Sequence, residues 1–309
     1  MSADPELDCR GMRIATMTPS SNTRAGDTRK LITRRRLLLR TFAALITGGF
    51  AVYADKIEPD NLEIARTDIH LPHWHASANG ITIGLISDFH ADYQHAVERV
   101  HQASALLADA KPDIVLLGGD YVSSHFTRRY LKPTIQCFGQ LSGAPLGAFA
   151  IMGNHDCWGN NVGIATRLLS AEGFQVLNNR AVPIPTVPNG YIVGVGDPWC
   201  KQMDLKKSLR GVPPDANKIL AMHEPDFADT IGTGFDLQLS GHSHGGQIRI
   251  PGLPLIHGPK YGRKYPEGLQ QAENHLVYTT RGVGMIGPQI RAFCDPEVTI
   301  LTLRTGHAG

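Results

Sequence analysis

The sequence contains few cysteines, and their spacing excludes the sites that cysteines most often build. The five are Cys9, Cys137, Cys157, Cys200 and Cys294. No two of them have Cys-x-x-Cys spacing, so neither a zinc knuckle nor a disulfide framework is indicated, although a single bridge stays open. Cys157 follows an acidic residue, and we expect it to be a buried structural thiol.

A strong charge of one sign is also missing. The formal net charge is +2 at pH 7, and without a clustered basic face nucleic acid is not an expected partner. Internal repeats and low-complexity linkers are absent after residue 55. With 309 residues, of which 42% are hydrophobic, the chain has enough material for a substantial core. We expect a single domain over residues 55–309.

The first 54 residues differ in character from the rest. Residues 1–30 are rich in Ser, Thr, Asp and Arg without an apolar period, and we expect them to be disordered. Basic residues at 34–36 then precede an uncharged stretch over residues 41–54, an order that is typical of a signal peptide. The pair Arg34 and Arg35 resembles a twin-arginine export signal.

This leader predicts export by the twin-arginine machinery to the periplasm or to the outer face of the cytoplasmic membrane. The uncharged stretch is shorter than the roughly 20 residues that a membrane span needs. An uncleaved anchor and a basic helix lying on the membrane stay open as alternatives, as does a later start at Met17.

From residue 81 onward, short apolar runs alternate with longer helical patterns, which predicts an α/β fold. The predicted strands cover residues 81–86, 113–117, 146–152, 191–195, 219–222, 236–239, 276–280 and 298–303. One predicted helix covers residues 97–107, and another begins within 164–169 and ends at Gly173.

Polar side chains sit at or just past the ends of five predicted strands. They are Asp88, Asp120, Asn154, His223 and His242. In α/β sheets the carboxyl ends of the strands are where sites form. We therefore expect these side chains to meet at one edge.

Several of these residues belong to short motifs with metal-ligand chemistry. Asp88 and His90 are one residue apart, so in an extended segment both side chains leave the same face and can grip one cation, although Asp-x-His often arises by chance. In Gly118-Gly119-Asp120 a carboxylate follows two residues without side chains, which allows close approach.

The later motifs are more specific. Gly153-Asn154-His155-Asp156 places an amide, an imidazole and a carboxylate in one turn, and His242 and His244 present two imidazoles on a glycine-flanked loop. A lone His223 would more often be structural. Two divalent ions, Asp88, Asp120 and a bridging hydroxide would leave a net charge of about +1, which attracts phosphate.

Together, Asp-x-His, Gly-Gly-Asp, Gly-Asn-His-Asp, the single His223 and Gly-His-x-His resemble the calcineurin-like metallophosphoesterase superfamily over about residues 80–250. Three further motifs, Ile57-Glu58-Pro59, Gly245-Gly246-Gln247 and Pro296-Glu297-Val298, resemble its bacterial branch of twin-arginine-exported or membrane-anchored phosphodiesterases. The resemblance implies a four-layer α/β/β/α sandwich with two metal ions at the strand ends.

The resemblance also implies a role for each motif residue. A first metal would be held by Asp88, His90 and His244, a second by Asn154, His223 and His242, and Asp120 would bridge the two. The ligand set accepts Mn, Fe, Zn or Co. His155 resembles the general acid, which protonates the leaving alkoxide while a metal-bridging hydroxide attacks phosphorus, and Asp156 is a candidate to orient its ring.

We expect a phosphodiesterase that acts on a small-molecule or lipid phosphate ester, with membrane association as an open option. The alternatives are a phosphomonoesterase, a pyrophosphatase of the UDP-diacylglucosamine type and a non-catalytic scaffold of the same fold. Some lipid-precursor hydrolases of the superfamily have Arg where this chain has His155, which argues against their specificity.

Two other clusters receive less weight. Lys260, Arg263 and Lys264 are expected to form a solvated loop, with a loop that holds the substrate phosphate as the alternative. His73 and His75 have no carboxylate partner nearby and are expected to serve surface or strand packing.

Overall fold

The computed structural model describes residues 34–232, 234–255 and 258–306. The segment 1–30, for which disorder is expected, lies outside these ranges, as do the side chains of Arg34 and Arg35. The chain divides into two compact units, Met1–Ile46 and Thr47–Gly309. Each is described by itself.

The first described element is an apolar helix. Helix α1 spans Arg34–Val52 and continues as a π-helical turn η1 (Tyr53–Ile57) and a 3-10 turn η2 (Glu58–Asp60). By length and composition, Arg36–Asp60 is sufficient to cross a membrane, a test that a signal sequence also passes. The helical run is therefore longer than the uncharged stretch alone indicates.

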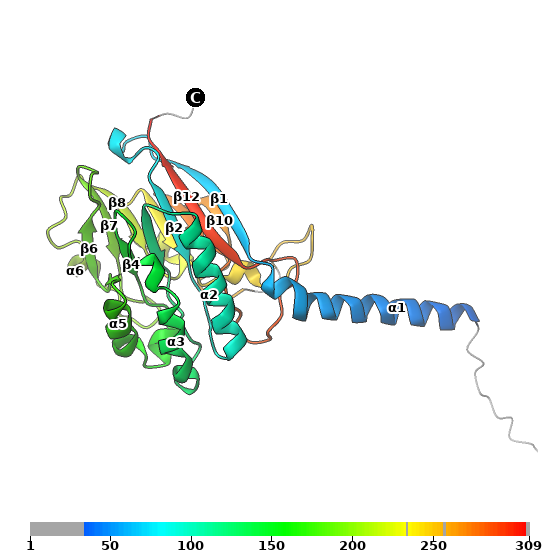
Figure 1. Cartoon of the computed structure of the whole chain (residues 1–309). Coiled ribbons are helices and arrows are strands. Elements are labelled where there is room, and N and C mark those ends of the chain that lie inside the picture. The colour runs from blue at the N-terminus through cyan, green and yellow to red at the C-terminus, as the bar shows by residue number, and fades with distance from the viewer. Residues whose placement is uncertain (1–33, 233, 256–257, 307–309) are drawn as a thin grey trace, which may run out of the picture. The chain divides into compact units, whose positions relative to one another are not determined.

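The larger unit contains two six-stranded sheets (Figure 1). In the first sheet the order is β1-β12-β2-β3-β4-β5, and in the second it is β10-β11-β9-β8-β7-β6. The strands are β1 Glu63–His70, β2 Thr82–Ile86, β3 Ile114–Leu117, β4 Ala148–Ala150, β5 Gln175–Val176, β6 Arg180–Pro183, β7 Gly190–Gly194, β8 Asn217–Ala221, β9 Leu237–Ser240, β10 Gly268–Gln271, β11 Leu276–Thr279 and β12 Glu297–Arg304.

The central strands are parallel. Strands β2, β3 and β4 run parallel in the first sheet, with Ile83 opposite Ile114, and β7, β8 and β9 run parallel in the second, with Ile192 opposite Ile219. All four residues of β3 are buried. Parallel strands covered on both faces are continuously apolar, which is why the sequence pattern identified them.

Apolar side chains between the two sheets, and between the first sheet and its helices, hold the layers of the fold together. The inner faces of the two sheets share one apolar cluster, to which Leu85, Leu116, Ile219 and Leu239 contribute. Helices α2 (Gln94–Asp109), α3 (Leu131–Gln136) and α5 (Val162–Ala171) cover the outer face of the first sheet (Figure 1).

On the outer face of the second sheet, the short helix α6 (Leu205–Ser208) and the turn η6 (Pro225–Asp229) pack against residues such as Val193 and Leu220. The result is helix, sheet, sheet, helix, so the expected four-layer α/β/β/α sandwich is confirmed.

Candidate metal centre

The predicted site residues meet at the carboxyl ends of the central strands. Asp88 follows β2, Asp120 follows β3, His223 follows β8 and His242 follows β9, while Asn154 begins the short helix α4 (Asn154–Trp158) after β4. None of the seven predicted metal ligands is more than 4% exposed. The first sheet supplies Asp88, His90, Asp120 and Asn154, and the second supplies His223, His242 and His244.

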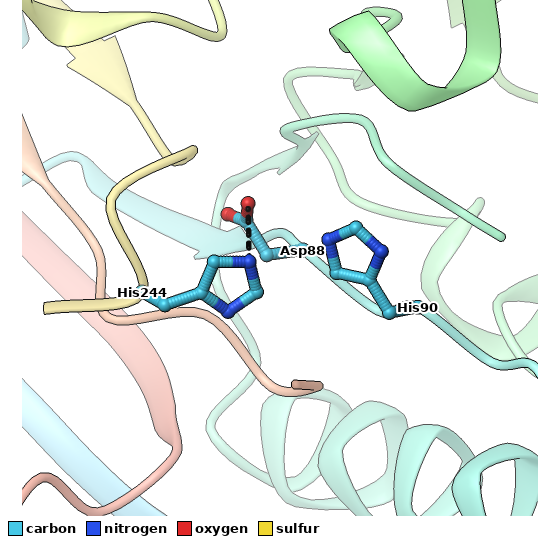
Figure 2. A group of neighbouring side chains, drawn as sticks. All are labelled: Asp88, His90 and His244. Atoms are coloured by element: carbon cyan, nitrogen blue, oxygen red, sulfur yellow. Dashed lines mark ion pairs between the residues drawn. The ribbon is translucent and has the colours of Figure 1, made fainter. Parts of the chain in front are cut away.

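The donor atoms of six of these ligands and of His155 form three overlapping groups. Asp88, His90 and His244 make the first (Figure 2), Asp120, His223 and His242 the second, and His90, Asp120 and His155 the third. Within each group the donor atoms lie within 4.8 Å of one another. The first two groups correspond to the two metal positions that the resemblance implies, and the third adds His155 at the same place.

The imidazoles are anchored on their outer nitrogens. His223 Nδ1 donates to the Gly118 carbonyl oxygen at 2.7 Å, and His242 Nε2 donates to the Lys260 carbonyl oxygen at 2.8 Å. His90 Nδ1 lies 2.7 Å from the Ser123 hydroxyl. Such anchoring by groups around the ligands fixes the ring orientation in metal sites.

The inner donor atoms have no such partner. His90 Nε2 and Asn154 Oδ1 are buried without a hydrogen bond to any described residue, and His223 Nε2 has the Asp120 carboxylate beside it, 3.1 Å away. Leaving a buried polar atom unpaired is costly. Imidazole nitrogens, an amide oxygen and carboxylates are a donor set for divalent transition metals, so the residues fit two such ions.

The electrostatics of the carboxylates favours a cation between them. Burial raises the pKa of Asp88 to about 6, against the opposing effect of His223, and nearby Asp120 raises it further. Burial alone would lower the pKa of His223, but the carboxylates of Asp120, 3.1 Å away, and Asp88, 3.8 Å away, hold it well above its usual value. The two carboxylates therefore stabilise a positive charge placed between them.

Two other histidines, His90 and His242, are unprotonated and so keep the lone pair with which an imidazole binds a metal. Burial lowers the pKa of His90 to about 4 and that of His242 to about 3. Both rings are thus neutral at physiological pH. A histidine must be neutral to bind a metal.

The backbone at the site differs from the sequence expectation. Asp88 and His90 are in the left-handed region, with φ of +56° and +39°, rather than in an extended segment, and Asp120, His242 and His244 share that conformation. Hydrogen bonds from the Asp88 and His90 amides to the Gly119 and Asp120 carbonyls hold this turn. Such strain costs about 1–3 kcal/mol per residue and is concentrated at functional sites.

His155 is oriented by a different group from the one expected. Its Nδ1 donates to the Ser123 carbonyl oxygen at 2.9 Å, which leaves Nε2 as the free nitrogen. Asp156 instead accepts hydrogen bonds from the amides of Asp120, Tyr121 and Gly153, and so fixes the loop that holds Asp120. Because Ser123 acts through its backbone, no side-chain pattern could identify it.

A disulfide lies beside the centre. Cys157 in α4 is bonded to Cys200, with 6.6 Å between their Cα atoms, so Cys157 is not the buried free thiol expected. Next to it, the Trp199 ring contacts the rings of Trp158 and His242 at 4.6 and 5.6 Å. The bridge thus joins the helix that begins at Asn154 to an aromatic rim.

Glu224 is a buried carboxyl residue beside His223 that was not among the site residues predicted from the sequence. It is fully buried, and burial together with the Asp197 carboxyl group raises its pKa well above its usual value although the adjacent His223 opposes this. Its position directly after His223 at a strand end was the available signal.

Among the weaker candidates, Lys260 contacts the site through its backbone carbonyl, which accepts from His242. Lys264 pairs with Asp229 at 2.6 Å, and Arg263 Nε donates to the Gly258 carbonyl, so both cations have local partners. The Lys260 amine lies 4.6 Å from the centre of the Tyr261 ring. His73 and His75 are exposed and belong to none of the three donor groups.

Comparison with known proteins identifies the family. The model of the calcineurin-like phosphoesterase family matches residues 81–246. Over 89% of this chain and 99% of its own length, the uncharacterized metallophosphoesterase YkuE of Bacillus subtilis is 31% identical.

Two further relatives have named activities. Phosphodiesterase YaeI of Escherichia coli is 32% identical, over 88% of this chain and 100% of its own length. UDP-2,3-diacylglucosamine pyrophosphatase LpxG of Chlamydia muridarum is 27% identical, over 81% and 92%. Together with the donor groups, these matches show that the chain belongs to the calcineurin-like phosphoesterase family and is a metal-dependent phosphoester hydrolase with a dinuclear divalent metal centre.

Proposed function

We propose that this hydrolase is a phosphodiesterase in which His155 is the general acid. The observation that carries the proposal is the position of His155, which belongs to the same donor group as His90 and Asp120 and whose Nδ1 is bonded to the Ser123 carbonyl. The similarity to a protein named as a phosphodiesterase, at 32% identity over 100% of that protein's length, supports the choice of diester.

The proposed ligand assignment follows the donor groups. Asp88, His90 and His244 would hold one metal, Asn154, His223 and His242 the other, and Asp120 both. Two divalent ions at this place supply Lewis acidity, which neutralises charge on the phosphoryl oxygens and lowers the pKa of water.

The chain's own contribution to the chemistry is proton transfer. The Ser123 carbonyl accepts the Nδ1 proton of His155, which leaves Nε2 as the nitrogen available for proton transfer. When protonated, Nε2 donates its proton to the leaving oxygen as the phosphorus–oxygen bond breaks. An edge-to-face contact with the His90 ring, 4.9 Å between centroids, supports this orientation.

A pyrophosphatase is the second candidate, favoured by the 27% identity to LpxG. The comparison of bis(4-nitrophenyl) phosphate with 4-nitrophenyl phosphate, using purified, metal-loaded protein, tests the diester proposal. We expect a higher kcat/KM for the diester. A strong preference for the monoester would refute the proposal, and cleavage of a nucleotide-linked pyrophosphate alone would favour the second candidate.

We further propose that residues 1–54 are a twin-arginine-type leader or anchor and that residues 55–309 act on the outer side of the cytoplasmic membrane. The apolar helix over Arg36–Asp60 supports this placement. So does the Cys157–Cys200 disulfide, because disulfides persist in oxidising compartments.

A reporter fused to residues 1–54 tests the route of export. We expect export to be lost when Arg34 and Arg35 are both replaced by lysine. Export that ignores these replacements would exclude the twin-arginine route.

A further inference from the structure

An apolar groove adjoins the metal centre. It has a volume of about 530 Å³, within the usual range for small-molecule sites. The proposed metal ligand His244 contributes to its lining, and the apolar walls are formed by Ile248, Ile250, Pro259, Ile286 and Pro288. The groove is therefore contiguous with the place where a phosphate would bind.

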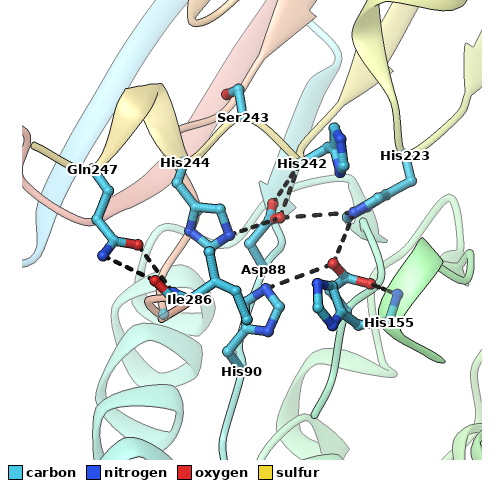
Figure 3. A network of polar contacts seen from close by, with 12 residues as sticks. Asp88, His90, His155, His223, His242, Ser243, His244, Gln247 and Ile286 are labelled. Atoms are coloured by element: carbon cyan, nitrogen blue, oxygen red, sulfur yellow. Dashed lines mark hydrogen bonds and ion pairs between the residues drawn. The ribbon is translucent and has the colours of Figure 1, made fainter. Parts of the chain in front are cut away.

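The groove is held open by hydrogen bonds within the chain. Gln247 receives a hydrogen bond from the Ile286 amide at 2.9 Å and donates to the Ile286 carbonyl at 3.2 Å (Figure 3). It also donates to the Pro288 carbonyl at 2.8 Å. These bonds tie one wall to the other. A preformed groove reduces the ordering cost of binding.

The lining offers a polar leaving group few free partners, because its polar side chains Ser243 and Gln247 donate to the carbonyls of Pro266, Ile286 and Pro288. Among the residues that line the groove, His244 is the one with a titratable side chain. A sugar or nucleoside would leave its hydroxyl groups unpaired against the isoleucine and proline walls, which costs free energy. A saturated hydrocarbon chain has no such groups.

The apolar surface continues away from the centre. Ile250 also lines a second hollow, of about 290 Å³, together with Leu253 and Phe293. The Phe293 ring stacks on Phe50 at 6.0 Å, within the Thr47–Gly309 unit. Leu253, Phe293 and Phe50 are all exposed, so the groove opens onto a surface suited to lipid.

We infer that the substrate is a phosphoester of an acyl-chain lipid, with the phosphate at the metal centre and part of the chain in this groove. The inference rests on the proposed phosphoester hydrolysis, whose substrate class it narrows. The adjacency of His244 to the Ile248 and Ile250 wall, together with the clamp at Gln247, carries it.

Binding of straight-chain alkylphosphonates with one to eight carbons, measured by calorimetry on the full chain loaded with Mn²⁺, tests this inference. Each methylene that enters the groove should lower Kd by about fourfold until the groove is full. The heat-capacity change of binding should become more negative in step, as expected for apolar burial.

Ile250→Asp should flatten this dependence on chain length. The matched control is Leu269→Asp on β10, since Leu269 is 38% exposed, against 52% for Ile250, and does not line the groove. The control should keep the dependence of the unmodified protein.

Equal affinity for methyl- and octylphosphonate would overturn the inference. The same holds if Ile250→Asp changes the oligomeric state and leaves the chain-length dependence intact, because the groove would then bind a second copy. Failure of the proposed function gives a different result, namely chain-length-dependent binding without hydrolysis of bis(4-nitrophenyl) phosphate.

Discussion

Among the histidines at the centre, His155 is distinguished by exposure and by the partner of its ring. It is partly exposed, whereas the four histidines proposed as ligands are buried. Its Nδ1 donates to the Ser123 carbonyl oxygen. Its backbone amide donates to Asp120 Oδ1 at 2.8 Å (Figure 3). A general acid has to reach the substrate, so this position suits His155 better than a closed ligand position.

The role of His155 gives the first prediction. His155→Ala should lower kcat by about 10²–10⁴-fold, the usual contribution of a general acid, while both metal ions remain bound. Activity assays combined with elemental analysis measure the two effects. His73→Ala, which removes an exposed histidine outside the donor groups, is the control. Loss of a metal ion from His155→Ala would mean that His155 is a ligand.

Single residues were the most predictable level of the site. Short motifs such as Gly-Asn-His-Asp specify which side chains can bind metal, and the structure brings six of the seven proposed ligands, together with His155, into the three donor groups. The orienting role of the Ser123 carbonyl was not predictable, because it depends on how two loops meet. The left-handed backbone at Asp88 and His90 was also missed, since tertiary hydrogen bonds impose it.

Among the elements, the junction between β4 and α4 depends on a glycine. A Cβ at Gly153 would collide with Asp120 Oδ1 and lie 2.8 Å from Cε1 of His223. Gly153→Ala should therefore displace the proposed bridging carboxylate and weaken metal binding by about 10–100-fold, as loss of ligand support does elsewhere.

Metal titration of Gly153→Ala measures this effect. Gly143→Ala is the matched control, because a Cβ at Gly143 has no atom within 4 Å. Equal metal affinity of the two variants would argue against close packing around Asp120.

The disulfide gives a prediction about stability. The bridge closes a loop with a sequence separation of 43 residues, and its loss through Cys200→Ser should lower the free energy of unfolding by about 2–4 kcal/mol. Denaturant titration in non-reducing buffer is the measurement. Cys137→Ser, at a free and half-buried thiol, should change stability far less. If Cys200→Ser unfolds at the same denaturant concentration as the unmodified protein, the bridge has no structural role.

The strands that the sequence patterns did not predict all lie at the edges of the sheets. The eight predicted strands all exist, whereas β1, β5, β6 and β10 were missed, and these four form the edges of the two sheets. Edge strands have fewer buried positions, as the mostly exposed or half-buried residues of β1 illustrate. Their apolar signal is correspondingly weak, and pairing with a neighbour decides their conformation.

Across the whole Thr47–Gly309 unit, the centre links the two sheets. Asp88 from the first sheet accepts hydrogen bonds from the His242 amide of the second at 2.9 and 3.0 Å, and His223 donates back to Gly118. Ions held by ligands from both sheets should stabilise the entire sandwich. A ligand that binds the folded state alone, at a free concentration of 100 Kd, adds about 2.7 kcal/mol per site.

The central claim is that this centre holds two divalent ions between the sheets, and metal content measured together with thermal unfolding tests it most directly. We predict two ions per chain after reconstitution with Mn²⁺. Chelation should lower Tm by on the order of 5–10 °C per site, reversibly on re-addition of Mn²⁺. Fewer than one ion per chain, with a Tm that chelation leaves unchanged, would contradict the account.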